Sequence, residues 1–597
     1  MKLTRKGERI NQTVRERSES VPELSDGRTM FPGSKAAAQL CVSTELMNVI
    51  TPMPSEIIGD LPVKAGERTA GVGGGKKRMP SCNGTDNPNG GSERMLTYRW
   101  SKTERMRCMM SKDNGTSTTL TGEKPIEREK FTWASVNWEQ AETTVGRMQS
   151  RISKAYRDGK PSLAKRLSYL LVHSFSAKLL AVKRVSEQNK GKNTPGTDGV
   201  LWKSDKAKEN AVLSLNQGKY RSRPLRRIYI PKKNGKMRPL SIPTMYDRAM
   251  QALYALALDP IQEATADPNS YGFRKGRSCQ DAMCQIQLMM CTAKKPDWVL
   301  EGDIKGCFDN FSHKWMLNNI PMDRKILKQF LKAGYVFEER LFPSETGSPQ
   351  GGVISPILAN MVLNGMEKLV CTISKAHLIR FADDFVVTCP SKESAEKIKE
   401  LIIPFLKERG LELSEEKTLI THIDDGFDFL GWNFRKLKVQ KRRFLMIQPS
   451  KRSIESIKKT VYETILKHGL AMTQNELITI LNPKLRGWCN YHCTAMSSKT
   501  FAEIDAYLFA TLFRWGMRRH KDKGKWWVGD RYWHRQGKRK WVFCTEENVL
   551  FRPIDVKKKR YVKVRNTANP YLDREYFQER QKFRKYERGY RDKSFAM

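Results

Sequence analysis

Three aspartates stand out because of their place in the apolar pattern of the sequence. Asp303 follows the apolar run of WVLEGDIKGCF, 298–308, which predicts a buried strand ending in a turn. Asp383 and Asp384 lie together in RFADDFVV, 380–387, which predicts two short strands around a polar tip. Carboxylates that converge from different elements can bind Mg²⁺, which prefers oxygen ligands. Two such ions can activate a 3′-hydroxyl group and stabilise a leaving pyrophosphate, which is the chemistry of nucleotidyl transfer.

An exposed Asp-Asp turn is the alternative interpretation of the aspartate pair, and it is the more common fate of such a pair. Two adjacent carboxylates repel each other, and bound metal ions are one way to remove that cost. The pair by itself therefore favours a simple surface turn, and the surrounding sequence has to decide between the two interpretations.

The elements that must position these aspartates alternate between strand and helix patterns. RRIYIPKKNGKMRPLSIPT, 226–244, predicts a hairpin that turns at Asn234-Gly235, with basic residues crowding the turn. Helical spacing predicts three helices, over 246–266, 279–293 and 392–409. After Pro449 the pattern is helical to about residue 520. Strands that alternate with helices, followed by a helical block, indicate an α/β region and then an all-α region.

The N-terminal part of the chain has a different composition. Residues 1–130 are rich in Gly, Ser, Thr, Asn, Lys and Arg, and we expect most of this segment to be disordered. Its GVGGGKK, 71–77, lacks the first glycine, the final Ser or Thr and the preceding strand of a phosphate-binding loop. We expect order to begin near Trp133. From Trp138 to Val185 the apolar residues recur at helical spacing, and an Asp-Gly pair at 158–159 predicts a division into two helices.

The charge balance indicates an anionic partner. The 597 residues include 108 Lys and Arg against 64 Asp and Glu, which gives a formal net charge of +44. Such an excess repels itself unless something anionic shares the surface, and nucleic acid is the leading candidate. Thirteen Trp, with many Tyr and Phe, are interleaved with the basic residues, as base stacking would use. A merely soluble basic protein is the alternative.

The remaining composition indicates a cytoplasmic protein without a membrane partner. The twelve cysteines have no disulfide rhythm and no second pair at zinc-finger spacing, so we expect reduced thiols. The sequence has no run of eighteen apolar residues, so we expect no transmembrane helix. The N-terminal residues contain no apolar core of a signal peptide.

In this setting the aspartate pair resembles the central motif of the reverse transcriptases, and specifically of the group II intron-encoded proteins, which are also called maturases. FADD, 381–384, resembles the family's aromatic-Ala-Asp-Asp box, and DIKGCFDNFSH, 303–313, resembles its first aspartate motif. SPQGGVISPILANMVLNGME, 348–367, resembles the loop and helix that brace the template and the incoming nucleotide. These segments follow the family's order, and the resemblance runs from about Trp133 to the C-terminus. Together they favour the metal site over the exposed turn.

The resemblance implies a role for each aspartate and for two neighbours. Asp303 and Asp383 would each bind both Mg²⁺ ions, and Asp384 would complete the catalytic cluster. Phe308 would be the steric gate that excludes a ribose 2′-hydroxyl, whereas its spacing alone favours a core Phe. Lys417, in LELSEEKTLI, would act as a general acid that protonates pyrophosphate; a lysine at a strand end with no such role is the alternative.

The resemblance also implies contacts with the nucleotide and the primer. Lys232 and Arg238 would hold the triphosphate, and a solvated basic turn is their alternative. Gln350, in PQGG, would lie near the incoming nucleotide, where the adjacent glycines permit close approach of the backbone. FLGW, 429–432, resembles the primer grip, and its alternative is an ordinary core strand.

Two segments point to the group II intron branch of the family. Residues 138–190 resemble its N-terminal finger extension, and TPGTDG, 194–199, resembles the motif that follows it. NPKLRGWCNYH, 482–492, resembles the thumb signature of maturases and would be helical, with Lys484 and Arg486 facing RNA. A purely structural helix is the alternative.

The C-terminal tail resembles the DNA-binding region that follows the thumb. ANPYLDREYFQERQ, 568–581, resembles the stretch that often precedes an HNH endonuclease. The sequence has no late cysteine pairs or histidine cluster that could hold such a nuclease site, so we expect no second-strand cleavage by this protein.

The resemblance predicts an α/β right-hand polymerase, followed by an all-α thumb and a small basic C-terminal domain. Fingers and palm would span 131–440, the thumb or maturase domain X 441–520, and a basic DNA-binding region 521–597. The function implied is an RNA-directed DNA polymerase of a group II intron that also assists splicing and supports mobility. The partners implied are the intron RNA as template, the target DNA with a primer 3′ end, and dNTPs. The cofactor would be Mg²⁺, with two ions in the site, and the location the bacterial cytoplasm or nucleoid.

Three other functions are weighed against this one. The first is a splicing-only maturase, an RNA-binding factor with an inactive polymerase, which the intact Asp303, Asp383 and Asp384 disfavour. The second is a retron or defence reverse transcriptase, which the finger extension and the RGW segment disfavour. The third is an RNA-directed RNA polymerase, which Phe308 and the FADD box disfavour.

Overall fold

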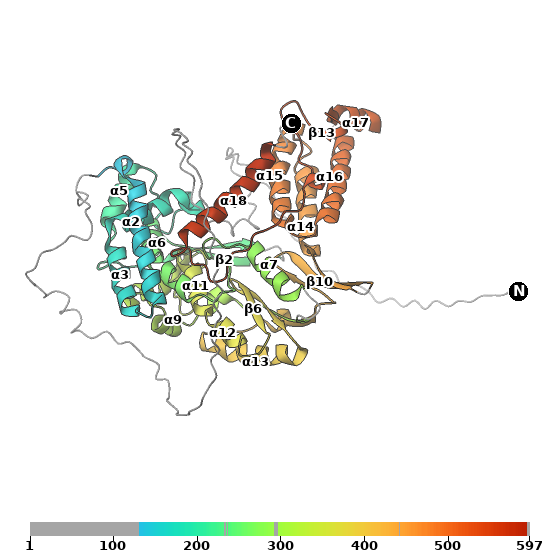
Figure 1. The fold of residues 1–597 in the computed structure, drawn as a ribbon. Helices are drawn as coiled ribbons and strands as arrows, with labels where there is room; N and C mark the ends of the chain where they lie inside the picture. The colour runs from blue at the N-terminus through green and yellow to red at the C-terminus, as the bar shows by residue number, and fades with distance from the viewer. Residues whose placement is uncertain (1–130, 232–234, 236, 292–295, 441, 594–597) are drawn as a thin grey trace, which may run out of the picture. The chain divides into compact units, whose positions relative to one another are not determined.

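The computed structural model describes residues 131–231, 235, 237–291, 296–440 and 442–593. The expected disorder of residues 1–130, the GVGGGKK segment, Lys232 and Asn234 lie outside this part of the chain. All the described residues belong to one compact unit. Figure 1 shows them as a ribbon coloured along the chain.

The described chain begins with a group of helices. After the short η2 (Trp133–Ser135) come α2 (Trp138–Arg157), α3 (Pro161–His173), α4 (Phe175–Lys183) and α5 (Asp205–Ser214). The predicted break at 158–159 is confirmed. The prediction of only two helices is wrong, because extended Ser174 ends α3 and its hydroxyl accepts the N–H of Ala177 at 3.2 Å to begin α4. Buried apolar residues of α2, α3 and α4 pack on α6 (Met245–Thr265).

A four-stranded sheet follows in the order β2-β1-β4-β5. The predicted hairpin is confirmed: β1 (Leu225–Pro231) and β2 (Met237–Ile242) pair antiparallel, with Arg226 opposite Ile242. On its other side β1 pairs parallel with β4 (Tyr335–Phe337), which forms its own hairpin with β5 (Arg340–Phe342). Between β2 and β4 the chain forms β3 (Trp298–Gly302), which belongs to the second sheet. Three short helices follow it: α8 (Cys307–Asn310), α9 (His313–Asn319) and α10 (Arg324–Leu331).

The second four-stranded sheet has the order β6-β7-β3-β8. Its neighbours all run antiparallel: β6 (His377–Phe381), β7 (Asp384–Cys389), β3 (Trp298–Gly302) and β8 (Leu419–His422). The predicted strand at 298 and the predicted pair of strands around 383 are therefore confirmed, and they are direct or next neighbours in one sheet. In β7 every residue after the first is buried, so both faces of this central strand are covered.

Helices cover the two faces of this sheet. Val387 and Cys389 of β7 pack with Ile398 of α13 (Lys392–Glu408), whereas Val386 packs with Ile286 of α7 (Cys279–Met290) on the opposite face. The predicted helices at 246–266, 279–293 and 392–409 are confirmed, except that 292–295 are not described. Two further helices, α11 (Ser355–Leu363) and α12 (Met366–Val370), precede β6. Val386 and Val387 enter different cores because successive side chains of a strand point to opposite faces of the sheet.

A small sheet joins this region to a helical block. Its strands lie in the order β11-β10-β9, formed by β9 (Phe427–Phe429), β10 (Trp432–Val439) and β11 (Arg442–Pro449). The predicted helical block after Pro449 is confirmed by α14 (Lys451–Tyr462), α15 (Gln474–His492) and α16 (Ser498–Arg519). Fully buried Trp432 of β10 stacks on Tyr491 of α15, with ring centroids 4.5 Å apart. This stack ties the helical block to the sheet.

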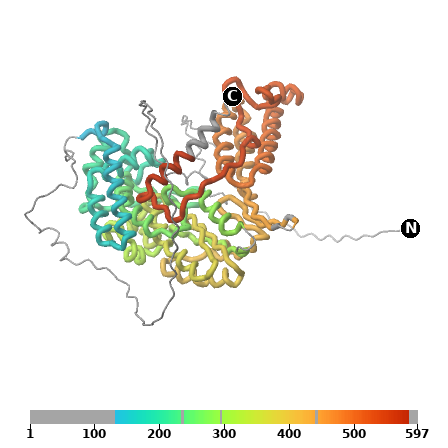
Figure 2. The backbone as a smooth tube through the Cα atoms, in the orientation of Figure 1, coloured from blue at the N-terminus to red at the C-terminus, as the bar shows by residue number. Residues whose placement is uncertain are grey.

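The C-terminal region consists of two parts that pack in different places. Residues of α17 (Lys525–Tyr532), β12 (Trp533–Gln536) and β13 (Arg539–Phe543) share one core with α14, α15 and α16. The chain then runs without regular strands from about residue 556 to 573 and ends in α18 (Arg574–Lys593). Figure 2 shows this red segment leaving the helical block and returning across the middle of the chain. None of the helices in the described part of the chain combines the length and the apolar character that crossing a bilayer requires.

We expect Trp432→Ala to lower the free energy of unfolding by about 3–5 kcal/mol, because it removes a fully buried ring and leaves a cavity. The midpoint of urea denaturation measures this change. The matched control is Trp526→Ala, since Trp526 is 79% exposed and its loss should cost at most about 0.5 kcal/mol. Equal midpoints for the two variants would contradict the packing of β10 on α15.

Candidate active site

The three aspartates predicted to act together come from neighbouring strands. Asp303 directly follows β3, and Asp384 is the first residue of β7. Because Gly302 lies opposite Phe385 in the antiparallel register, the residue after Gly302 lies across from Asp384. Asp383 occupies the turn between β6 and β7. Sheet register alone therefore brings the three carboxylates to the same edge.

The turn that carries Asp383 is held in an unusual conformation. Ala382 has a positive φ of 59°, which L-residues rarely adopt. Gly272 packs against this turn so closely that an added Cβ would lie 2.3 Å from the Ala382 nitrogen. Fully buried Arg380 donates to the Ala382 carbonyl at 3.2 Å and to the Asn360 side chain at 3.2 Å. The backbone of the turn is thus fixed from two sides.

A second Asp-Asp pair in the same chain shows what the simple surface turn looks like. Asp424 and Asp425 are exposed after β8, and Asp424 forms an ion pair with Arg443 at 2.6 Å. The pair at 383–384 differs because a third carboxylate faces it from the adjacent strand.

Burial and neighbouring negative charge raise the pKa values of Asp383 and Asp384. Desolvation raises the pKa of Asp383, and the negative charge of Asp303 adds to the rise, while Arg238 and Lys417 oppose it. The pKa of Asp384 is raised to about 7 by desolvation and then by Asp383 and Asp303. A cation at this edge would lower the repulsion.

Lys417 lies at the same edge. Its Nζ donates to Asp303 Oδ2 at 2.9 Å, and this hydrogen bond raises the pKa of the Lys417 ammonium group. The Asp303 main chain helps to place it, because the Asp303 carbonyl accepts the N–H of Ser414 at 2.8 Å, three residues before Lys417. The ammonium group is therefore positioned next to the carboxylates, where a proton donor to a leaving group would be needed.

The donor set suits a hard divalent cation, although the side chains do not form a closed ligand group. All three candidates offer only carboxylate oxygens, which are the ligands that Mg²⁺ prefers. Within the described residues, no three His, Cys, Asp or Glu side chains are already arranged to hold a metal ion. The ion pair between Lys417 and Asp303 uses one of the oxygens that a metal would need. A cation would have to displace that ammonium group from Asp303.

Phe308 and Gln350 lie on two segments that are joined beside the aspartates. The Ser348 N–H donates to the Phe308 carbonyl at 2.7 Å. The Gln350 Nε2 donates to both carboxylate oxygens of Asp309, each at 3.1 Å. Phe308 is only half-buried, with edge contacts to Phe273 at 6.4 Å and Phe311 at 5.9 Å. Phe308 packs against the edge of the main core and is partly exposed, so it is not the fully buried core Phe that spacing alone favoured.

The remaining predicted binding residues lie in different parts of the structure. Arg238 is exposed on β2, and its positive charge is near enough to Asp383 to oppose the rise in the pKa of that carboxyl group. Lys484 is half-buried and donates to Thr464 at 2.9 Å inside the helical block, which favours its structural interpretation. Exposed Arg486 lies over the ring of Phe551, 5.0 Å from the centroid. The FLGW segment forms a sharp turn, whose Leu430 carbonyl accepts from the Tyr491 hydroxyl at 2.8 Å.

Sequence reasoning missed the residues that hold the aspartate turn. Gly272, Asn269, Asn360 and Arg380 contact the turn or the strand that leads into it, but none carries chemistry of its own. One signal was available: Arg380 is a charge inside an otherwise apolar strand, and such a residue is buried only when it is paired. Asn269 and Gly272 come from the loop after α6 and Asn360 from α11, and only the fold brings them to the turn.

Three family models match separate parts of the chain. The model described as reverse transcriptase (RNA-dependent DNA polymerase) matches residues 230–434. The N-terminal domain of reverse transcriptase matches 133–215, and the maturase-specific domain of group II introns matches 454–533. The matched ranges coincide with the first helices, the two large sheets and the helical block.

The chain is similar to several curated proteins. It is 31% identical to the group II intron-encoded protein LtrA of Lactococcus lactis subsp. cremoris, over 51% of this chain and 66% of that protein. It is 33% identical to the protein YkfC of Escherichia coli K12, over 42% of this chain and 79% of that protein. The chain thus spans just under two thirds of the length of LtrA. A telomerase structure from Candida albicans aligns at 12% identity over 53% of this chain and 65% of that chain, with a TM-score of 0.30.

We expect Gly272→Ala to destabilise the turn at 381–384, because its Cβ would overlap the backbone of that turn. Overpacking of this kind costs about 1–3 kcal/mol. Hydrogen exchange of the peptide 377–389 should accelerate, and the thermal midpoint should fall. The control Gly218→Ala meets only the end of the flexible Asn216 side chain at 3.4 Å, so its exchange should match the unaltered protein. Unchanged exchange in Gly272→Ala would refute this close packing.

Proposed function

The chain belongs to the reverse transcriptase and maturase proteins encoded by group II introns, and from this premise we propose that it is an RNA-directed DNA polymerase that also assists the splicing of its intron RNA. The observation that carries the polymerase function is the meeting of Asp303, Asp383 and Asp384 at one edge of the β6-β7-β3-β8 sheet. The reaction would add deoxynucleotides to a primer 3′-hydroxyl, with an RNA strand as the template.

We propose that the aspartates hold two Mg²⁺ ions, since reverse transcriptases depend on divalent metal ions. Asp303 and Asp383 would bind both ions, and Asp384 would complete the site. When bound, the ions would activate the 3′-hydroxyl group and offset the charge of the pyrophosphate. The elevated pKa of Asp384, about 7, supports this assignment, because carboxylates that repel one another are stabilised by cations.

Other residues would bind and orient the deoxynucleotide. Arg238, exposed on β2, would neutralise the triphosphate together with Lys232. Gln350, whose amide is oriented by Asp309, would contact the nucleotide. The half-buried ring of Phe308 would exclude a 2′-hydroxyl by contact, with Phe273 and Phe311 packed at its edges. Lys417 would give a proton to the leaving pyrophosphate.

The domains of the protein follow from these roles. We assign the fingers and palm to 131–440, the thumb to 441–520 and DNA binding to exposed parts of 521–597. In the last segment, exposed Trp526, Trp527 and Trp541 stand among lysines and arginines, which suits contacts with both bases and phosphates. Target DNA and a primer 3′ end would be bound there, in support of intron mobility.

Splicing assistance would need no catalytic group of the protein. A basic surface that binds the active form of a folded RNA better than other forms shifts the RNA toward that form. The match of 454–533 to the maturase-specific domain supports this role. A splicing-only maturase remains the alternative, and a silent polymerase in a protein that binds RNA would favour it.

We expect Asp383→Ala to lower dTTP incorporation on poly(rA)/oligo(dT) with Mg²⁺ by about a thousand-fold or more. The reason is that several kcal/mol of charge stabilisation by metal ions would be lost. The matched control is Asp425→Ala in the exposed Asp-Asp pair, which should keep the rate of the unaltered protein. Equal rates in the two variants would place the reaction elsewhere, and an inactive unaltered protein would refute the polymerase.

We expect Arg486→Ala to weaken binding of a structured group II intron RNA and to reduce the slope of log affinity against log salt by about 1, because one phosphate contact would be lost. Lys484→Ala is the matched comparison. It should leave the slope unchanged and instead lower the thermal midpoint, since Lys484 is engaged by Thr464. The opposite pattern would show that Lys484, and not Arg486, faces the RNA.

A further inference from the structure

The chain returns to the polymerase region after its helical block. We call residues 559–581 the C-terminal strap. At its start the Lys559 N–H donates to the carbonyl of Cys493, just after α15, at 2.8 Å. Farther along, the Asn569 side chain donates to Ser153 Oγ of α2 at 3.0 Å. The strap therefore connects the helical block to the first helices of the described chain, as Figure 2 shows.

The strap is buried in the places where it crosses the loop between α6 and α7. Arg580 forms an ion pair with Asp281 at 2.6 Å, and the two side chains are 5% and 0% exposed. The Tyr571 hydroxyl donates to Asp259 and accepts from Lys275 Nζ at 2.6 Å. Buried charges and hydroxyl groups are stable only with such partners. The contacts show a specific interface rather than a tail lying on the surface.

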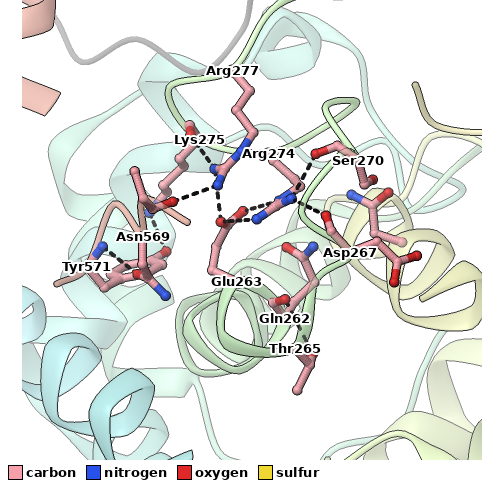
Figure 3. Close-up of polar contacts among 12 residues, drawn as sticks. Gln262, Glu263, Thr265, Asp267, Ser270, Arg274, Lys275, Arg277, Asn569 and Tyr571 are labelled. Atoms are coloured by element: carbon pink, nitrogen blue, oxygen red, sulfur yellow. Dashed lines mark hydrogen bonds and ion pairs between the residues drawn. The ribbon is translucent and has the colours of Figure 1, made fainter. Parts of the chain in front are cut away.

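The strap also completes a network of buried charges inside that loop. Glu263 at the end of α6 bonds Arg274 at 2.9 Å and Arg277 at 3.0 Å, and all three side chains are at most 2% exposed. Arg277 also donates to the Ala568 carbonyl of the strap at 2.7 Å. Figure 3 shows Asn569 and Tyr571 of the strap beside these residues. Without the strap, part of this network would lose its cover and one of its acceptors.

The same loop supports the strand that leads into the aspartate turn. The Asn269 carbonyl accepts the N–H of Arg380 at 3.0 Å, and the Tyr271 N–H donates to the Arg380 carbonyl at 2.9 Å. Residues 269–271 thus pair with β6 like an additional short strand. Gly272 then packs on Ala382, the residue before Asp383.

Asn566 joins the strap to this pairing. Its Nδ2 donates to Asn269 Oδ1 at 2.7 Å, while the Asn269 side chain donates to Glu367 at 2.6 Å. Asn269 is 7% exposed, so water has little access to its amide, and the Tyr271 hydroxyl donates to the same oxygen at a longer 3.3 Å. Asn566 is therefore joined to Asn269 by one hydrogen bond. The Asn269 carbonyl in turn accepts the N–H of Arg380, which lies three positions before Asp383.

We propose that the C-terminal strap positions the aspartate turn, and that Asn566 is a positioning residue for the polymerase reaction. The proposal rests on the proposed polymerase function. It extends that function to a segment whose sequence suggested only DNA binding. Asn566 touches neither nucleotide nor metal; it fixes the side chain of Asn269, and through it the pairing of residues 269–271 with β6. A displacement of about 1 Å at reacting groups can lower a rate by about a hundred-fold.

The variant Asn566→Asp tests this role with almost no change of shape. It replaces the donor facing Asn269 Oδ1 by an acceptor, and it keeps an oxygen for Lys563, which donates to Asn566 Oδ1. The matched control is Val562→Ala, because the Val562 side chain lies in the same strap and is 48% exposed. The full chain is used throughout, with dTTP, poly(rA)/oligo(dT) and Mg²⁺.

We expect Asn566→Asp to lower kcat by about ten-fold or more with an unchanged KM for dTTP, measured well below the thermal midpoint, which falls because two acceptors now face each other. Val562→Ala should match the unaltered protein. A role in binding nucleic acid would instead raise the KM for the template-primer, and a merely structural role would lower the thermal midpoint while kcat per folded molecule stayed unchanged. Either of those results would overturn the proposal, as would an unchanged kcat.

Hydrogen exchange tests the same inference without the reaction. Amides of peptides covering 267–274 and 377–385 should exchange faster in Asn566→Asp than in Val562→Ala. If the unaltered protein adds no dTTP, the polymerase function fails, and the exchange comparison still decides whether the strap holds the turn. Should Asn566→Asp fail to fold, Asn566→Ala provides the same comparison. Equal exchange in these peptides would overturn the inference.

Discussion

The repulsion among Asp303, Asp383 and Asp384 is the constraint on which the rest of the site depends. Antiparallel pairing of β3 with β7 brings the three carboxylates to one edge, where burial and the charges of Asp383 and Asp303 raise the pKa of Asp384 to about 7. Like charges at the ends of strands would move apart if the backbone allowed it. The fold prevents this by burying both faces of the sheet and by placing Lys417 beside Asp303. The arrangement therefore favours the binding of cations, and it keeps the ammonium group of Lys417 close by.

Rigidity of the aspartate turn comes from outside its own sheet. Arg380 is a fully buried cation whose donors are used by Asn360, Asn364 and the Ala382 carbonyl. The loop at 269–272 pairs with the same strand and packs its glycine on the turn. A buried polar network of this kind favours one conformation, since any other would leave more polar groups without partners. The loop is in turn held by Glu263 and by the C-terminal strap, so segments from distant parts of the chain converge on the turn.

The C-terminal region combines two physical roles. Its first part presents exposed tryptophans and basic residues on elements that share the core of the helical block, which suits a surface for nucleic acid. Its second part, the strap, buries charged and polar side chains against α2, α6 and α7. The strap also begins beside Cys493 at the end of α15, so it connects the proposed thumb with the proposed palm. The sequence after the helical block therefore packs on the region that carries the aspartates and also presents an exposed surface.

The sequence by itself determined the strands around Asp303 and Asp383, the hairpin near Gly235, the main helices and the helical block, because these depend on local periodicity and turn residues. It also indicated the three aspartates, since a known order of motifs surrounds them. It did not reveal that a separate helix, α4, begins after Ser174. There a single side-chain hydrogen bond outweighs a continuous apolar pattern. Nor could it reveal that Lys484 is engaged by Thr464, or that Gly272, Asn269 and Asn566 support the turn. Those contacts join residues up to 297 positions apart, and only tertiary structure decides such pairs, because no local pattern records which distant side chain fills a buried site.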